Sequence, residues 1–103
     1  MAFYKETGEN SWEASIFFDP EDGIYGDHFP GNPVVPGSLI THAFLAVSEA
    51  IGLTGKTPVL QNFKFRSFVS PGTYRCTVRR TEDRILFELF DGESLAAEGT
   101  AKP

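Results

Sequence analysis

The sequence has few of the residues that metal, redox and nucleophilic sites need. Its 103 residues include one cysteine, Cys76, and two histidines, His28 and His42. One cysteine cannot form an internal disulfide, and Cys76 falls in an alternating apolar pattern that is typical of packing rather than of a nucleophile. Two histidines at this spacing offer too few ligands for a zinc site. We therefore expect neither a metal nor a disulfide framework.

Positive charge is also scarce. Nine Lys and Arg face fourteen Asp and Glu, which gives a formal net charge of −5. This balance argues against nucleic acid or an anionic membrane surface as the main partner. The cations of the second half are interpreted as ordinary solvated strand surface: Lys64, Arg66, Arg75, Arg79, Arg80 and Arg84.

Long apolar runs are missing too. No stretch is long enough to cross a bilayer, and we expect no signal peptide. These absences predict a cytoplasmic protein without a membrane partner. The length predicts one domain over residues 1–103. Ten phenylalanines allow a dense core, and they also suggest an apolar surface that a second subunit covers.

The stretch from Asp27 to Ile51 organises the chain. It opens with a loop that prolines stiffen, and glycines such as Gly31 and Gly37 permit close approach of a ligand. Apolar residues at helical spacing then predict a helix from about Ser38 to Ile51. Because this helix starts directly after Pro36-Gly37, its free N–H groups and positive dipole end are expected beside the loop that carries His28. The expected apolar face holds Leu39, Ile40, Ala43, Phe44, Val47, Ala50 and Ile51, and the other face holds Ser38, Thr41, His42, Ser48 and Glu49.

Alternating patterns around this helix predict strands. They cover residues 12–18, 59–68, 74–81, 85–90 and 94–101, with hairpin turns at 82–84 and 91–92. Residues 1–11 are polar and are predicted to be frayed, apart from Phe3 and Tyr4, whose rings are candidates for docking. A single apolar helix among antiparallel strands should be covered by the sheet. The predicted fold is therefore α+β, with a curved antiparallel sheet wrapped around one long central helix.

Two motifs carry a resemblance to a known family. The first runs from the loop into the helix and reads His28-Phe29-Pro30-Gly31 followed by Pro33-Val34-Val35-Pro36-Gly37; the second reads Phe63-Lys64-Phe65-Arg66 followed by Val69-Ser70-Pro71-Gly72. Together with the element order they make residues 13–101 similar to the hot-dog fold β-hydroxyacyl–acyl carrier protein dehydratases. The resemblance implies a hydro-lyase that forms trans-2-enoyl thioesters in fatty acid or polyketide-type synthesis.

Only one of the family's two catalytic side chains has the same residue type at the matching position of this sequence. Its loop histidine matches His28, but its helix acid, six positions after the proline of the Pro-Gly step, falls on His42. The glutamine that many members carry one turn further on is replaced by Ala46. The resemblance implies that loop and helix residues come from opposite subunits of a dimer. It also implies a substrate-binding set made of Phe29, Gly31, Pro36, Gly37 and Ser38.

Dehydration needs a base for the α-proton, an acid for the leaving hydroxyl and a donor to the thioester oxygen. His28 suits the role of base, since imidazole titrates near neutral pH. The N–H of Gly37, at the helix N-terminus, suits the role of donor. A protonated His42 could supply the acid, and two facing imidazoles favour one charged and one neutral ring. The alternatives are an acid from a related subunit, or Glu49, which lies roughly 10 Å along the helix from His42.

Other interpretations stay open. His28 could only order the loop, and His42 could be a structural or tunnel-lining residue. The leading hypothesis is an enzyme acting on an acyl group held by acyl carrier protein, with no cofactor beyond the carrier's phosphopantetheine. A hot-dog thioesterase is the second hypothesis, and an inactive acyl-binding subunit of a heterodimer is the third. A homodimer, a higher homo-oligomer and a mixed dimer are all compatible with the sequence.

Overall fold

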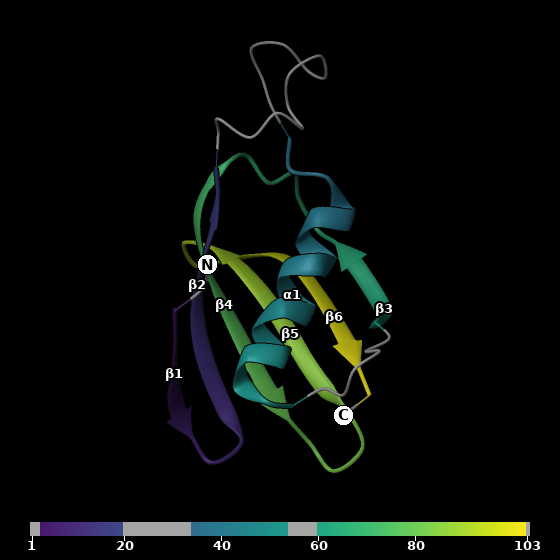
Figure 1. Cartoon of the computed structure of the whole chain (residues 1–103). Coiled ribbons are helices and arrows are strands. Elements are labelled where there is room, and N and C mark those ends of the chain that lie inside the picture. The colour runs from purple at the N-terminus through teal and green to yellow at the C-terminus, as the bar shows by residue number, and fades with distance from the viewer. Residues whose placement is uncertain (1–2, 20–33, 54–59, 103) are drawn as a thin grey trace.

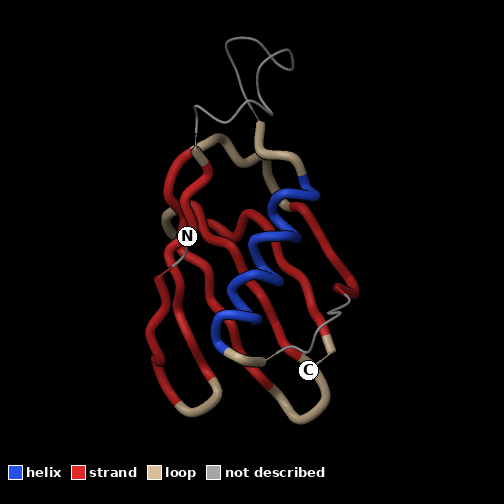
Figure 2. The backbone as a smooth tube through the Cα atoms, viewed as in Figure 1, coloured by secondary structure: helices blue, strands red, loops and turns tan. Residues whose placement is uncertain are grey.

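A computed structural model describes residues 3–19, 34–53 and 60–102 of the chain. Within them lie six strands and one helix: β1 (Phe3–Gly8), β2 (Ser11–Phe18), α1 (Gly37–Ile51), β3 (Leu60–Phe65), β4 (Gly72–Arg80), β5 (Ile85–Asp91) and β6 (Ser94–Ala101). The strands form one sheet in the order β1-β2-β4-β5-β6-β3, and every neighbouring pair is antiparallel. Figures 1 and 2 show α1 lying along one face of this twisted sheet. The predicted α+β hot-dog architecture is confirmed.

The core forms where α1 meets the sheet. Apolar residues recur at helical spacing in α1 and at every second position in the strands, so one stripe and one sheet face are buried together. The ring of Phe44 stacks on that of Phe87 with centroids 5.2 Å apart, and both side chains are fully buried. Cys76 is buried in the same layer, which confirms its packing role. Burial, and to a smaller extent the nearby charge of Glu88, raises the pKa of its thiol to about 12.

The bounds of helix α1 agree with the predicted span to within one residue, but two of its side chains differ from the prediction in burial. It begins at Gly37, one residue before the predicted start, and ends at Ile51 as predicted. Ser48 was predicted on the polar face, but it is fully buried and its Oγ donates to the carbonyl of Leu45 at 2.9 Å. That bond satisfies the hydroxyl locally, so the core can accept it. Ala50 was predicted on the apolar face and is exposed instead.

Two strand predictions also need correction. Part of the segment expected to be frayed forms β1, an edge strand whose register runs from Phe3 opposite Ser15 to Gly8 opposite Ser11. The strand predicted over 59–68 ends at Phe65, so Phe68 lies beyond it. In the second case the regular β3–β6 pairing ends at Phe65 opposite Ala97, and beyond it the N–H groups of Arg66 and Ser67 both donate to one carbonyl, that of Ala96.

The cations of the second half have exposed side chains, as expected of solvated strand surface. Arg66 pairs with Glu98 at 2.9 Å, and the guanidinium of Arg75 lies 4.4 Å from the ring centre of Phe90. Within the described residues, α1 is not long and apolar enough to cross a membrane.

Candidate active site at the N-terminus of α1

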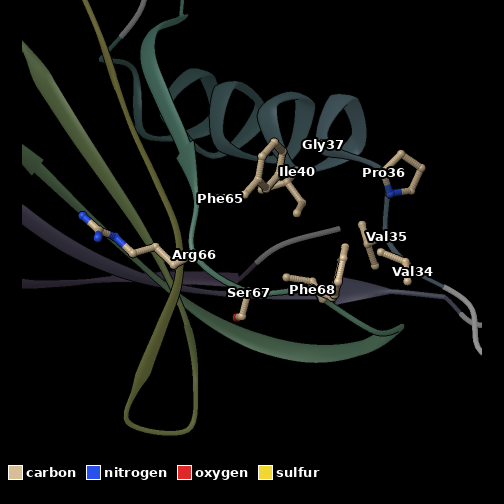
Figure 3. A pocket seen from close by; sticks show the side chains of 10 residues that line it. Val34, Val35, Pro36, Gly37, Ile40, Phe65, Arg66, Ser67 and Phe68 are labelled. Atoms are coloured by element: carbon tan, nitrogen blue, oxygen red, sulfur yellow. The ribbon is translucent and has the colours of Figure 1, made fainter.

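An apolar groove lies beside the start of α1. It has a volume of about 680 Å³, within the range of small-molecule sites. Figure 3 shows α1 and Phe65 on one side of it, with Phe68 and the segment before α1 facing them. The lining residues are Val34, Val35, Pro36, Gly37, Ile40, Phe65, Arg66, Ser67, Phe68 and Val69. All but Arg66 and Ser67 carry apolar side chains or none.

Backbone hydrogen bonds hold both walls of the groove in place. The N–H of Val35 donates to the carbonyl of Val69 at 2.6 Å, which ties the segment before α1 to the segment after β3. The N–H groups of Arg66 and Ser67 both donate to the carbonyl of Ala96, at 2.8 and 3.2 Å. The groove is therefore a fixed junction between α1, β3 and β6 rather than a gap between loose ends.

Gly37 is a glycine for a reason that the structure makes plain. A Cβ built on Gly37 would lie 2.1 Å from the nearest atom of the Phe65 ring, far inside contact distance. The Phe65 ring in turn lies edge-on to that of Phe63, with centroids 4.4 Å apart. Phe63 continues the contact to Phe44, at 5.8 Å, in the core. The first residue of α1 is thus packed directly against a row of rings that reaches the centre of the molecule.

Within the part of the chain that the structure describes, no side chain caps the N-terminus of α1. Pro36 occupies the N-cap position in an extended conformation, no side chain caps the helix, and its first turn contains no acidic residue. The N–H groups of Leu39 and Ile40 donate to the carbonyl of Pro36. The positive end of the helix dipole therefore points toward Pro36 and the groove, and the first turn of the helix supplies no carboxylate to offset it.

The predicted site residues divide into three groups. Pro36 and Gly37 line the groove. Ser38 and His42 are exposed on α1 and do not line it; the carbonyl of Ser38 accepts a hydrogen bond from Thr41 Oγ1 at 2.9 Å. The third group, His28, Phe29 and Gly31, lies outside the described residues. Within one chain, then, the groove and His42 face different sides of α1.

Phe63 and Phe65 stand two positions apart in the second motif, and either could belong to the core or to the wall of the groove. The structure separates them, because Phe63 packs against the buried core while Phe65 lines the groove. It also adds Val34 and Phe68 to the lining. Val34 belongs to the motif before the helix, so its position in that motif is the signal that could have identified it. No local pattern marks Phe68, which reaches the groove only because β3 stops at Phe65.

Comparison with known proteins decides the family. The chain matches the ApeI-like family, described as ApeI dehydratase, over residues 4–100. It belongs to the ApeI-like dehydratase family. Among curated relatives, it is 44% identical over 74 residues to the 3-hydroxyacyl-[acyl-carrier-protein] dehydratase FabZ of Oenococcus oeni. That similarity covers 60% of this chain and 52% of the relative, so the chain spans about half the length of that protein.

Solved structures with the same fold include members of two reaction classes. The dehydratase heterocomplex ApeI:P from Xenorhabdus doucetiae superposes with a TM-score of 0.79 at 19% identity, over 97% of this chain and 92% of that one. A structure described as a putative thioesterase, a phenylacetic acid degradation-related protein from Ralstonia eutropha, gives 0.70 at 18% identity, over 97% and 81%. At these identities the likeness is one of fold. The fold alone therefore does not choose between dehydration and thioester hydrolysis.

Proposed function

We propose that this protein dehydrates 3-hydroxyacyl thioesters carried by acyl carrier protein, giving trans-2-enoyl thioesters. The observation that carries the proposal is the apolar groove beside an uncapped helix N-terminus. An acyl chain needs apolar walls, and a thioester oxygen that gains negative charge needs fixed N–H donors. Membership of a dehydratase family supports this reaction over thioester hydrolysis.

The reaction requires the α-proton and the β-hydroxyl to leave. In the proposed mechanism, His28 takes the proton from the α-carbon while the N–H of Gly37 stabilises charge on the thioester oxygen. One donor of this kind is worth about 3–4 kcal/mol in the transition state. The electrons of the broken C–H bond form the new double bond as the bond from the β-carbon to oxygen breaks. A protonated His42 gives its proton to the departing hydroxyl, which leaves as water.

The position of His42 supports the proposal that a second subunit contributes to the site. Its side chain is exposed on α1 and does not line the groove of its own chain. We infer that it acts in a groove to which another chain contributes. That chain is a second copy or a related subunit, and the similarity to a structure described as a dehydratase heterocomplex supports the second choice. A related subunit with an acidic residue at the matching position would complete the site even if His42 were a weak acid.

The test is turnover of 3-hydroxybutyryl and crotonyl thioesters of acyl carrier protein, followed by mass spectrometry. Interconversion of the two is expected, by the chain alone or together with a related dehydratase subunit. Release of a free carrier thiol would instead identify a thioesterase. Binding of both thioesters without turnover in either preparation would identify an acyl-binding subunit and would end the enzymatic proposal.

A further inference from the structure

Phe68 is the most exposed of the large apolar side chains in the described part of the chain. It exposes 88% of its surface, against 56% for Phe17 and 54% for Phe65. An aromatic ring left in water forgoes the gain of burial, which is large for a side chain of this size. A ring this exposed beside an apolar groove therefore calls for something that covers it.

The exposure does not come from a loose backbone. On one side of Phe68, the N–H of Ser67 donates to the carbonyl of Ala96 at 3.2 Å. On the other side, the carbonyl of Val69 accepts from Val35 at 2.6 Å, and the Val69 side chain is buried. The Cα of Phe68 is therefore held at the rim of the groove, and only its ring is free to change rotamer.

The two aromatic rings that line the groove, those of Phe65 and Phe68, differ in the contacts that hold them. Phe65 is about half exposed, but one edge of its ring packs on Gly37 and the ring lies edge-on to Phe63, so these two contacts restrain it. Phe68 faces it across the groove, as Figure 3 shows. Phe65 is therefore restrained by ring contacts that lead to the core, whereas Phe68 makes no ring contact with the described residues. Exposed side chains change rotamer within nanoseconds, so the Phe68 ring can move without any change in the backbone.

We propose that Phe68 is a rotating cover for the acyl chain, and that it makes the enzyme favour chains long enough to lie between its ring and Phe65. The inference rests on the proposed function, because the occupant is the acyl group of the thioester. An apolar chain suits this position, since Arg66, the one charged residue among the described lining residues, is already paired with Glu98. A chain too short to pass beneath the ring gains nothing from it.

Phe68→Ala tests the proposal, with Phe17→Ala as the matched control. Phe17 is also an exposed phenylalanine, but it lies on β2 and does not line the groove. The readout is kcat/KM for 3-hydroxyacyl thioesters of four and ten carbons. Each CH2 taken out of water changes an equilibrium by about four-fold. If one ring covers between one and two CH2 groups, Phe68→Ala should lower the ten-carbon value by about ten-fold and leave the four-carbon value within about two-fold. Phe17→Ala should leave both values unchanged, and Phe68→Leu should recover part of the loss.

Two further measurements keep the outcomes distinct. Light scattering reports the oligomeric state, and calorimetry reports binding of decanoyl- and butyryl-pantetheine. Equal losses for both chain lengths, or a smaller assembly in Phe68→Ala, would overturn the proposal, since the ring would then serve the reacting centre or a subunit contact. If the wild type turned over neither thioester, the proposed function would fail. The ratio of the affinities for decanoyl- and butyryl-pantetheine would still decide the role of Phe68. A ten-carbon to four-carbon affinity ratio that does not fall in Phe68→Ala would refute the cover.

Discussion

The two ends of α1 are built in opposite ways. At the C-terminal end, Gly52 adopts a left-handed conformation and donates to the carbonyls of Ser48 and Glu49, while Leu53 N–H also donates to Ser48. The hydroxyl of Tyr4 donates to the carbonyl of Ala50 as well. Among the described residues, the N-terminal end has no side-chain cap and no acidic residue in its first turn, and an apolar groove lies beside it. The closed end stabilises the fold, and the open end leaves its N–H groups and dipole to a ligand.

The largest expected effect concerns the exposed face of α1. We expect His42→Ala to lower kcat by about 10²- to 10⁴-fold, the usual contribution of a general acid. Glu49→Gln, nearer the closed end on the same helix, should change kcat by less than about two-fold. His42→Glu introduces the acidic side chain that the β-hydroxyacyl–acyl carrier protein dehydratases carry at the matching position, and it should retain most of the activity. Steady-state kinetics on a carrier-protein thioester measures all three, and full turnover by His42→Ala would remove this residue from the mechanism.

A glycine stands at each end of α1, and replacing each by alanine compares the ends directly. Gly37→Ala should displace the Phe65 ring, costing about 1–3 kcal/mol of overpacking and most of the activity. Gly52→Ala has free space around it but a φ of +89°, so it should cost about 1–2 kcal/mol of strain and leave kcat unchanged. Urea unfolding and kinetics separate the two effects.

A double variant checks the cause of the first effect. Gly37→Ala combined with Phe65→Leu should lose less stability than the sum of the two single variants, because the smaller side chain makes room for the new methyl group. Additive losses would show that the ring is not what limits position 37.

Cys76, on β4, provides a probe of the buried core. Its pKa is raised to about 12 in the folded protein, so folding favours the neutral thiol. The associated stability is fully present below the pKa of the unfolded thiol and is lost as pH rises from about 9 toward 12, with a slope near 1.4 kcal/mol per pH unit. Unfolding by urea at pH 7, 9 and 10 measures this slope, and Cys76→Ala should remove it. An identical slope in Cys76→Ala would assign the pH dependence to other groups.

The smallest expected effect belongs to the closed end. Tyr4→Phe removes the hydrogen bond to Ala50 and nothing else. Since Tyr4 is about half exposed, water replaces much of the bond, and we expect a loss of about 0.5 kcal/mol with unchanged turnover. Thermal unfolding detects this change. Lower activity in Tyr4→Phe would contradict the assignment of stability to the C-terminal end of α1 and of ligand binding to its N-terminal end.

Local pattern was enough for most of the fold. The helical spacing of Ile40, Phe44 and Val47 predicted α1 to within one residue, because burial of one stripe is what makes that segment helical. The edge strand β1 was missed because a polar segment gains its structure from pairing with β2 rather than from its own composition. Ser48 was misplaced because a buried hydroxyl satisfied by its own helix leaves no trace in the sequence.

The site was predictable only in part. Pro36 and Gly37 were identified from their motif and line the groove. Phe68 was not, because its exposure depends on where β3 ends and on backbone bonds to β6 and to Val35. The roles of His28 and His42 stay predictions, which the kinetics above address.

The contact between Gly37 and Phe65 has a consequence for the whole family of sequences. A relative with a side chain at the position of Gly37 must have a smaller side chain at the position of Phe65, or its helix must lie further from the sheet. These two positions should therefore change together through evolution, and their joint variation would record in each lineage how much room the helix start leaves for its ligand.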